Sequence, residues 1–211
     1  MFSTFDRMGR TLLYLVRHGE QLRASGDGDD PGLGLSALGA RQASCLGERL
    51  AGTTFDVMRH SPLSRAAETA RILSGYLPDV PVTESDLLAD RTPVPAPGLE
   101  DSVPEQYRWF LDTVPEEERD VGGTLLDAAF ARLAVASDAD RRELLVTHNF
   151  VIGWFVRHVL AAPWWRWMGL NQVNCALTII GVQASEPPAL VTFNDAGHLP
   201  VDHWGEQIRT R

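Results

Sequence analysis

Short apolar runs alternate with amphipathic stretches along most of this chain. The run TLLYLV at 11–16 is apolar almost throughout, which is typical of a central strand buried on both faces. The stretches between such runs place apolar residues at helical spacing. The expected strands cover 11–16, 55–59, 142–148, 174–182 and 189–193, with a short extended piece after the turn in YLPDVPV. The expected helices cover 37–51, 62–77, 103–113, 121–136 and 150–160.

Polar residues precede three of these helices and are expected to cap them. Ser36 stands before the first helix and Asn149 before the apolar helix at 150–160. Ser61 is followed by Pro62, the pair expected at a cap and first helical position. Helix starts are therefore predicted at these three points.

Strands that alternate with helices predict an α/β protein with a largely parallel central sheet, flanked by helices on both faces. A length of 211 residues suits one domain, so residues 1–211 are interpreted as a single unit. Within it, 84–99 is rich in Pro and Asp and is expected to be irregular. Residues 84–125 are interpreted as an insertion that covers the functional site.

Composition narrows the chemistry. The net charge of −9 disfavours nucleic acid and anionic membrane surfaces as partners. All 19 cationic side chains are arginine, so Schiff-base lysine chemistry and a Walker-type phosphate loop are excluded. Any bound phosphate must be held by Arg, His or backbone N–H groups.

The length of the apolar runs bears on the expected cellular location of the protein. None of them approaches the ~20 residues that span a bilayer. The N-terminal run makes a better strand than a signal peptide, so the expected location is the cytoplasm, with no membrane partner. Cys45 and Cys175 are far apart and are expected to be reduced thiols.

Three apolar strands run directly into cationic or imidazole residues. LLYLV leads into Arg17 and His18, FDVMR leads to the helix that starts near Arg65, and ELLV leads to His148. Carboxyl ends of strands in an open α/β sheet face one crevice, so these four side chains are expected to converge. Arg matches phosphate oxygens, and a helix start also favours an anion. Two Arg and two His balance the charge of phosphate with no metal, so no metal site is predicted.

At these residues the sequence resembles the histidine phosphatase superfamily, also called the phosphoglycerate mutase-like family. The likeness rests on LYLVRHGEQ, LSALGARQA at 35–43, HSPLSRAAETA at 60–70 and VTHNFVI at 146–152. DLLADRTPVPAP at 86–97 and NDAGHLP at 194–200 are similar to the branch that contains a mitochondrial Ser/Thr phosphatase. The resemblance implies a three-layer sandwich and a cofactor-free hydrolase acting on phosphomonoesters.

The resemblance also implies roles for individual residues. His18 would be the nucleophile that forms a phosphohistidine, while Arg17, Arg65 and His148 would bind the phosphoryl oxygens. A carboxylic acid would protonate the leaving group, and its pKa should be raised beside a phosphate dianion. Asp90 occupies the acid position by the narrower likeness. Glu84, six residues earlier, stays the rival candidate.

Besides Asp90, which is one methylene shorter than the Glu that many members carry as the acid, two positions depart from the family pattern. Many mutase-type relatives carry Asn six residues after the nucleophile, where this chain has Ala24. A small residue commonly follows the second histidine, whereas here Asn149 follows His148. The predicted role of Asn149 as a helix cap accounts for the second departure.

Alternatives stay open on function, substrate and assembly. A phosphoglycerate mutase and a catalytically silent phosphate-binding adaptor are the competing functions. The substrate is expected to be a phosphorylated small molecule or a phosphoprotein, and a homodimer is among the open oligomeric states. Trp164, Trp165 and Trp167 are interpreted as core or oligomer contacts, with a binding platform as the alternative.

Overall fold

The computed structural model describes residues 9–23 and 32–204, so Ala24 lies outside the described residues. The strands are β1 Thr11–Arg17, β2 Val57–His60, β3 Val82–Glu84, β4 Thr92–Val94, β5 Arg119–Val121, β6 Arg141–Thr147, β7 Leu177–Val182 and β8 Ala189–Asp195. The α-helices are α1 Ala37–Leu50, α2 Ser64–Ser74, α3 Glu105–Asp112, α4 Thr124–Leu133 and α5 Asn149–Val159. Short 3-10 helices are η1 Asp86–Leu88, η2 Glu100–Ser102, η3 Glu116–Glu118, η4 Trp164–Gly169 and η5 Val201–Trp204.

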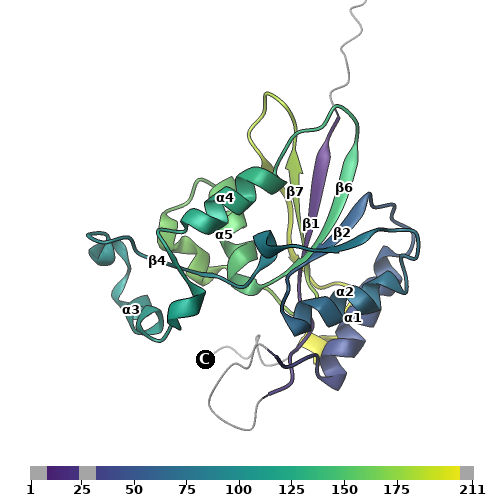
Figure 1. The fold of residues 1–211 in the computed structure, drawn as a ribbon, viewed down its shortest axis with the longest axis horizontal. Coiled ribbons are helices and arrows are strands. Elements are labelled where there is room, and N and C mark those ends of the chain that lie inside the picture. Colours follow the sequence, from purple (N-terminus) through teal and green to yellow (C-terminus); the bar gives the residue numbers. More distant parts are fainter. Residues whose placement is uncertain (1–8, 24–31, 205–211) are drawn as a thin grey trace, which may run out of the picture.

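A six-stranded sheet in the order β3-β2-β6-β1-β7-β8 forms the centre of the molecule (Figure 1). The first four strands pair in parallel. β7 pairs antiparallel with β1, and β8 pairs antiparallel with β7. The α/β class with a largely parallel sheet is therefore confirmed, and the chain's last two strands supply the antiparallel pairings.

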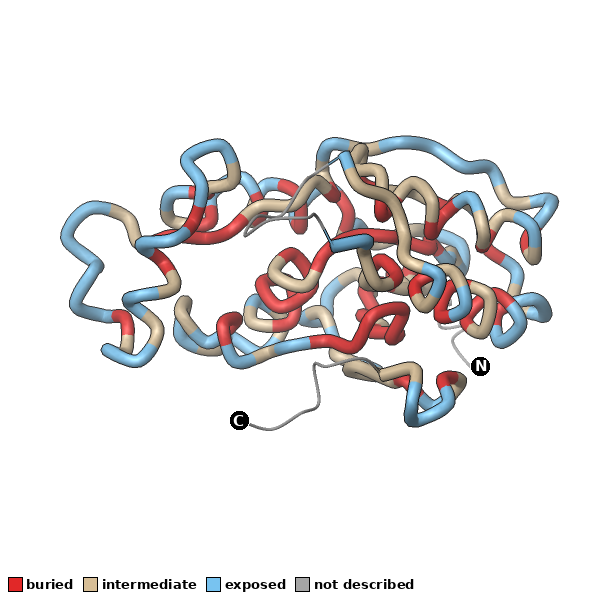
Figure 2. The backbone as a smooth tube through the Cα atoms, turned by 90° about the horizontal axis from the view of Figure 1, so that it is seen from below, coloured by how far each residue is buried: buried red, intermediate tan, exposed pale blue. Residues whose placement is uncertain are grey.

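Successive strand residues point to opposite faces of the sheet, and each face is covered by its own helices. Leu15 and Leu145 pack with α4 and α5 in one hydrophobic cluster. Val16 and Val146, one residue further along, pack with α1 and α2 in another. Figure 1 shows α1 and α2 on the opposite side of the sheet from α4 and α5. In Figure 2 the buried positions run through the middle and the exposed positions follow the outer loops.

The segment after β1 is held close to the start of α1. Ser36 caps α1 as predicted, because its Oγ accepts a hydrogen bond from the Gly39 N–H at 3.0 Å. A Cβ on Gly39 would lie 2.1 Å from the Glu20 carbonyl oxygen, so only glycine allows this approach. The glycine in LSALG thus lets α1 pack directly behind the residues that follow His18.

The region 84–125 contains more regular structure than the sequence predicts. Residues 92–94, expected to be irregular, form β4, which pairs in parallel with β5 at 119–121. The helix expected from residue 121 begins at Thr124, because β5 uses 119–121. Asp120 is buried, and its two carboxylate oxygens accept from the backbone N–H groups of Leu125 and Leu126 at 3.0 and 2.9 Å. This carboxylate satisfies the first turn of α4 although it stands outside the helix.

The tryptophans in η4 pack against helices rather than forming an isolated exposed platform. Trp167 is buried, and its ring makes edge contacts with Phe110 and Phe150. Trp164 and Trp165 are partly buried against the same hydrophobic cluster. Packing thus accounts for the cluster. None of the helices within 9–23 and 32–204 combines the length and the apolar character that a bilayer span requires.

Candidate active site

The pairing of β1 with β6 brings His18 and His148 together. Arg17 is opposite Thr147 in the parallel register, so the residue after each strand end lies at the same level. The His18 and His148 ring centroids are 5.1 Å apart, and both side chains are buried. β2 lies on the other side of β6 and ends at His60, which places Ser61 next in the row. The expected convergence at the carboxyl edge of the sheet is therefore present.

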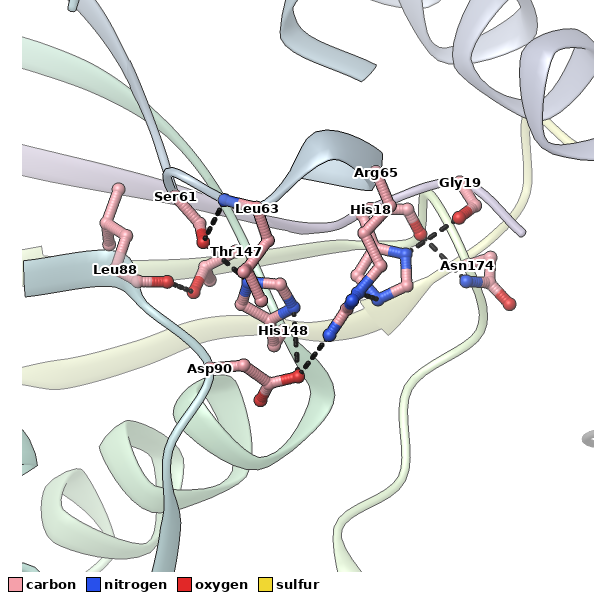
Figure 3. A network of polar contacts seen from close by, with 10 residues as sticks. All are labelled: His18, Gly19, Ser61, Leu63, Arg65, Leu88, Asp90, Thr147, His148 and Asn174. Atoms are coloured by element: carbon pink, nitrogen blue, oxygen red, sulfur yellow. Dashed lines mark hydrogen bonds and ion pairs between the residues drawn. The ribbon is translucent and has the colours of Figure 1, made fainter. Parts of the chain in front are cut away.

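The His18 ring is oriented by its own loop. Its Nδ1 lies 2.7 Å from the Gly19 carbonyl oxygen, which can only accept a hydrogen bond. Nδ1 therefore carries the proton, and Nε2 of the neutral ring presents a lone pair. The Arg65 Nε–H points at this lone pair, with 3.2 Å between the nitrogens (Figure 3). His18 thus has the tautomer that a nitrogen nucleophile needs.

Arg65 lies in the first turn of α2, as the sequence predicts. However, α2 begins at Ser64 rather than at Pro62, and Leu63 occupies the cap position without a side-chain cap. The Arg65 guanidinium is buried, and its Nη2 donates to Asp90 Oδ2 at 2.6 Å. Its Nη1 is buried without a hydrogen-bond partner among the described residues. A buried cation with an unused donor is suited to receive an anion oxygen.

His148 occupies the cap position of α5 and contacts a different residue through each ring nitrogen. Its Nε2 lies 2.7 Å from Ser61 Oγ, and its Nδ1 lies 3.2 Å from Asp90 Oδ2 (Figure 3). The prediction that Ser61 caps α2 is wrong, because Leu63 occupies the cap position; the Ser61 hydroxyl accepts from the Leu63 N–H at 3.3 Å before the helix begins and also contacts the His148 ring. The sequence did contain a signal for this contact, the serine four residues before Arg65, but the sequence analysis assigned that serine to a helix start.

Arg17 is held by the segment that follows η4. Its Nη1 donates to the Gln172 carbonyl oxygen at 2.6 Å. In the same segment, Asn174 Nδ2 donates to the His18 carbonyl oxygen at 2.8 Å. Sequence reasoning missed Gln172 and Asn174, because both act on the backbone or through it and neither belongs to a recognisable pattern.

The structure separates the two candidate acids. Asp90 follows η1, and its carboxylate bridges Arg65 and His148 (Figure 3). Glu84 is exposed at the end of β3, where it is paired in register with His60. Of the two, only Asp90 is brought among the converging side chains.

Burial shifts the pKa values of three groups in the site. Desolvation, followed by the neighbouring His148 and arginine charges, holds the pKa of His18 well below its usual 6.5. Desolvation and the charges of Arg65 and Arg17 lower the pKa of His148 in the same way. Desolvation raises the pKa of Asp90, although Arg65 and Arg17 oppose the rise. The pKa of Asp90 is therefore raised, as expected for the acid, but the cause in the structure is burial rather than a neighbouring phosphate.

The charge at the site comes from arginine. Across 9–23 and 32–204, no group of three or more His, Cys, Asp or Glu side chains is placed to hold a metal ion. Arg17 and Arg65 flank His18 and Asp90 faces them, so the site combines two cations, a neutral imidazole and a carboxyl group.

The family model described as histidine phosphatase superfamily (branch 1) matches residues 13–196. The chain belongs to the histidine phosphatase superfamily. The match includes every residue named above as part of the site.

Sequence relatives of this histidine phosphatase chain include the mitochondrial serine/threonine-protein phosphatase PGAM5. The Mus musculus and Homo sapiens proteins are each 31% identical over 197 residues, which is 90% of this chain. The chain spans 64% of the length of each of these relatives. The likeness to the Ser/Thr phosphatase branch is therefore confirmed.

Solved structures reproduce the fold at lower sequence identity. The α-ribazole phosphatase of Shigella flexneri superposes with a TM-score of 0.65 at 19% identity and covers 88% of this chain and 96% of that one. The phosphoserine phosphatase of Entamoeba histolytica gives 0.59 at 22%, with 90% and 100% covered. The phosphoglycerate mutase of Plasmodium falciparum gives 0.58 at 22%, with 92% and 96% covered. The mutase-like sandwich is confirmed.

The lowered pKa of His18 predicts a specific pH dependence of stability. Between pH 6.5 and 5.5 the unfolded chain takes up a proton at this residue that the folded protein excludes. The free energy of unfolding should therefore fall with falling pH, by up to about 1.4 kcal/mol per pH unit for one histidine. His18→Gln removes this contribution and should flatten the slope by up to that amount. Urea titrations of both proteins across this range measure it, and equal slopes would contradict the assignment.

Proposed function

We propose that this protein is a metal-independent phosphatase that hydrolyses phosphomonoesters through a phosphohistidine on His18. The observation that carries the proposal is the unprotonated Nε2 of His18 beside the Arg65 guanidinium. A nucleophile must present a lone pair, and the lowered pKa keeps the ring neutral at physiological pH. Arg65 lies where an oxygen of the transferring phosphoryl group would need a cation.

The first chemical step transfers the phosphoryl group to the protein. The His18 Nε2 lone pair attacks phosphorus while the bond from phosphorus to the ester oxygen breaks. Arg17, Arg65 and His148 stabilise the charge on the three equatorial oxygens. Burial raises the pKa of Asp90, which favours the carboxylic acid form, and this acid gives its proton to the departing alkoxide.

The second step releases phosphate. Asp90, now a carboxylate, takes a proton from a water molecule as the water oxygen attacks phosphorus. The bond from phosphorus to Nε2 breaks, and the electron pair returns to His18. The cycle ends with inorganic phosphate, neutral His18 and protonated Asp90, so no external acid or metal is consumed.

Asp90 has a second effect because it contacts the groups that would hold phosphate. Its Oδ2 lies 2.6 Å from Arg65 Nη2 and 3.2 Å from His148 Nδ1. As a carboxylate it competes with substrate for these donors. When Asp90 is protonated, its ion pair with Arg65 is lost and its carboxylic acid can donate a proton. Binding of the dianion is therefore coupled to proton uptake by Asp90.

The names of the relatives support two substrate classes for this chain. The PGAM5 relatives are named as serine/threonine-protein phosphatases, whereas the fold neighbours include phosphatases of small molecules. A panel of phosphopeptides and small phosphomonoesters distinguishes the classes by kcat/KM.

His18→Ala tests the proposed nucleophile. Wild-type protein is expected to hydrolyse p-nitrophenyl phosphate in the presence of EDTA, and His18→Ala is expected to lose turnover, because the proposed acceptor of the phosphoryl group is removed. His60→Ala, one strand away and half-buried, is the matched control and should stay active. Full activity of His18→Ala would overturn the mechanism.

Two readouts in the same experiment address the competing functions. Incubation with 3-phosphoglycerate should release inorganic phosphate, and recovery of an isomeric phosphoglycerate would favour a mutase. Tight phosphopeptide binding by a wild-type protein that shows no turnover would favour the adaptor.

Asp90→Asn tests the acid. Turnover of an alkyl phosphate such as glycerol phosphate should fall by about 10²–10⁴-fold, because the leaving alkoxide needs a proton. The fall should be smaller for p-nitrophenyl phosphate, whose leaving group is stable without one. Affinity for inorganic phosphate should rise, since the substitution removes a negative charge from Arg65. Isothermal titration and steady-state kinetics measure both effects.

Glu84→Gln is the matched control for this substitution. The residue is exposed and is expected to leave both kcat and phosphate affinity unchanged. If Glu84→Gln slows turnover and Asp90→Asn does not, the acid has been assigned to the wrong carboxyl.

A further inference from the structure

Residues 171–175, which connect η4 to β7, lie against the end of β1 and hold it at several points. Arg17 donates from Nη1 to the Gln172 carbonyl oxygen at 2.6 Å, and its own carbonyl oxygen accepts from the Cys175 N–H at 2.9 Å. Asn174 holds the backbone of His18, as Figure 3 shows. The position of Arg17 thus depends on the position of this segment.

The segment is in turn fixed by two asparagines from outside it. Asn149 Oδ1 accepts from the Gln172 N–H at 2.8 Å, and Asn149 Nδ2 donates to Asn171 Oδ1 at 3.0 Å. Asn194 Oδ1 accepts from the Val173 N–H at 2.8 Å. Asn194 therefore holds the peptide unit that carries the Gln172 carbonyl, and Asn149 holds the peptide unit before it, so both peptide bonds of Gln172 are fixed.

Asn149 does not have the role that its place before a helix predicts. His148 occupies the cap position of α5, and Asn149 is the first residue inside the helix. Both ends of the Asn149 amide are used by residues 171 and 172 instead. The cap prediction is therefore wrong. A small residue at this position could not reach the Gln172 N–H.

We propose that Asn149 is a positioning residue for Arg17. It acts through one residue: its Oδ1 holds the Gln172 N–H, and the Gln172 carbonyl, in the next peptide unit, holds the Arg17 guanidinium. The inference deepens the proposed function, on which it rests, because it assigns a determinant of phosphate affinity to a residue outside the anion cradle. Asn149 also follows His148 directly, so two consecutive residues act on the proposed phosphate site. His148 belongs to the site itself, and Asn149 acts on Arg17 through Gln172.

The affinity for inorganic phosphate, measured by isothermal titration calorimetry, tests this role of Asn149 without requiring turnover. Asn149→Ala removes one hydrogen bond in the relay and should weaken phosphate binding by about threefold to tenfold. Asn171→Ala is the comparison variant: it removes the other partner of Asn149 but keeps the acceptor for the Gln172 N–H, so it should cost less affinity than Asn149→Ala.

A double-mutant cycle separates positioning from general stability. Arg17→Ala should weaken phosphate binding, and adding Asn149→Ala should produce no further loss, because the relay then has no arginine to position. Independent, multiplicative losses in the double variant would overturn the inference. So would an Asn171→Ala defect equal to that of Asn149→Ala. Melting temperatures of all variants show whether loss of folding accounts for any change in affinity.

The outcomes also distinguish this inference from the proposed function. If wild-type protein binds phosphate and Asn149→Ala binds it equally well, only the positioning role of Asn149 fails. If wild-type protein hydrolyses no phosphomonoester but the affinity pattern holds, the phosphatase proposal fails and the relay stands. A wild-type protein that binds no phosphate contradicts both.

Discussion

The buried Arg65 guanidinium is the interaction on which the site depends. It reaches His18 Nε2 with one nitrogen and Asp90 Oδ2 with another, so one planar group sets the spacing between the proposed nucleophile and the proposed acid. A buried cation is costly unless an anion accompanies it. Asp90 supplies that anion in the structure, and a phosphoryl group would supply it during the proposed reaction. This exchange of one negative charge for another explains why the acid must lie within reach of the same arginine.

The parallel sheet brings these side chains together without strained backbone conformations or long loops. Parallel pairing of β2, β6 and β1 ends three strands at one edge, so Ser61, His148 and His18 occupy adjacent positions without unusual loops. α2 starts directly after β2 and α5 directly after β6, which brings Arg65 and His148 in at helix beginnings. Asp90 is not at the end of one of these three strands or at the start of either helix. It is held by the segment after η1, which the Thr147 hydroxyl anchors by donating to the Leu88 carbonyl oxygen at 2.8 Å.

The sequence was most informative where one strong local pattern matched the global fold. Apolar runs of strand length predicted the five long strands, and the residues that end three of them predicted the cradle. It was weakest where a polar residue had two uses. Ser61 and Asn149 both suit a helix cap, and in each case a tertiary partner, His148 or the Gln172 N–H, takes the side chain instead. β4 and β5 have three residues each and are separated by 24 residues of chain, so local periodicity does not reveal their pairing. The choice between Asp90 and Glu84 needed the path of the chain after β3, which only the structure gives.

Mapping of the phosphoenzyme tests the central claim most directly. Wild-type protein is mixed with a ³²P-labelled phosphomonoester, quenched in alkali within milliseconds and digested, and the labelled peptide is sequenced. The account predicts an acid-labile, alkali-stable label on the peptide that contains His18. A label on another residue, or turnover with no labelled protein at any quench time and at enzyme concentrations comparable to substrate, would contradict it.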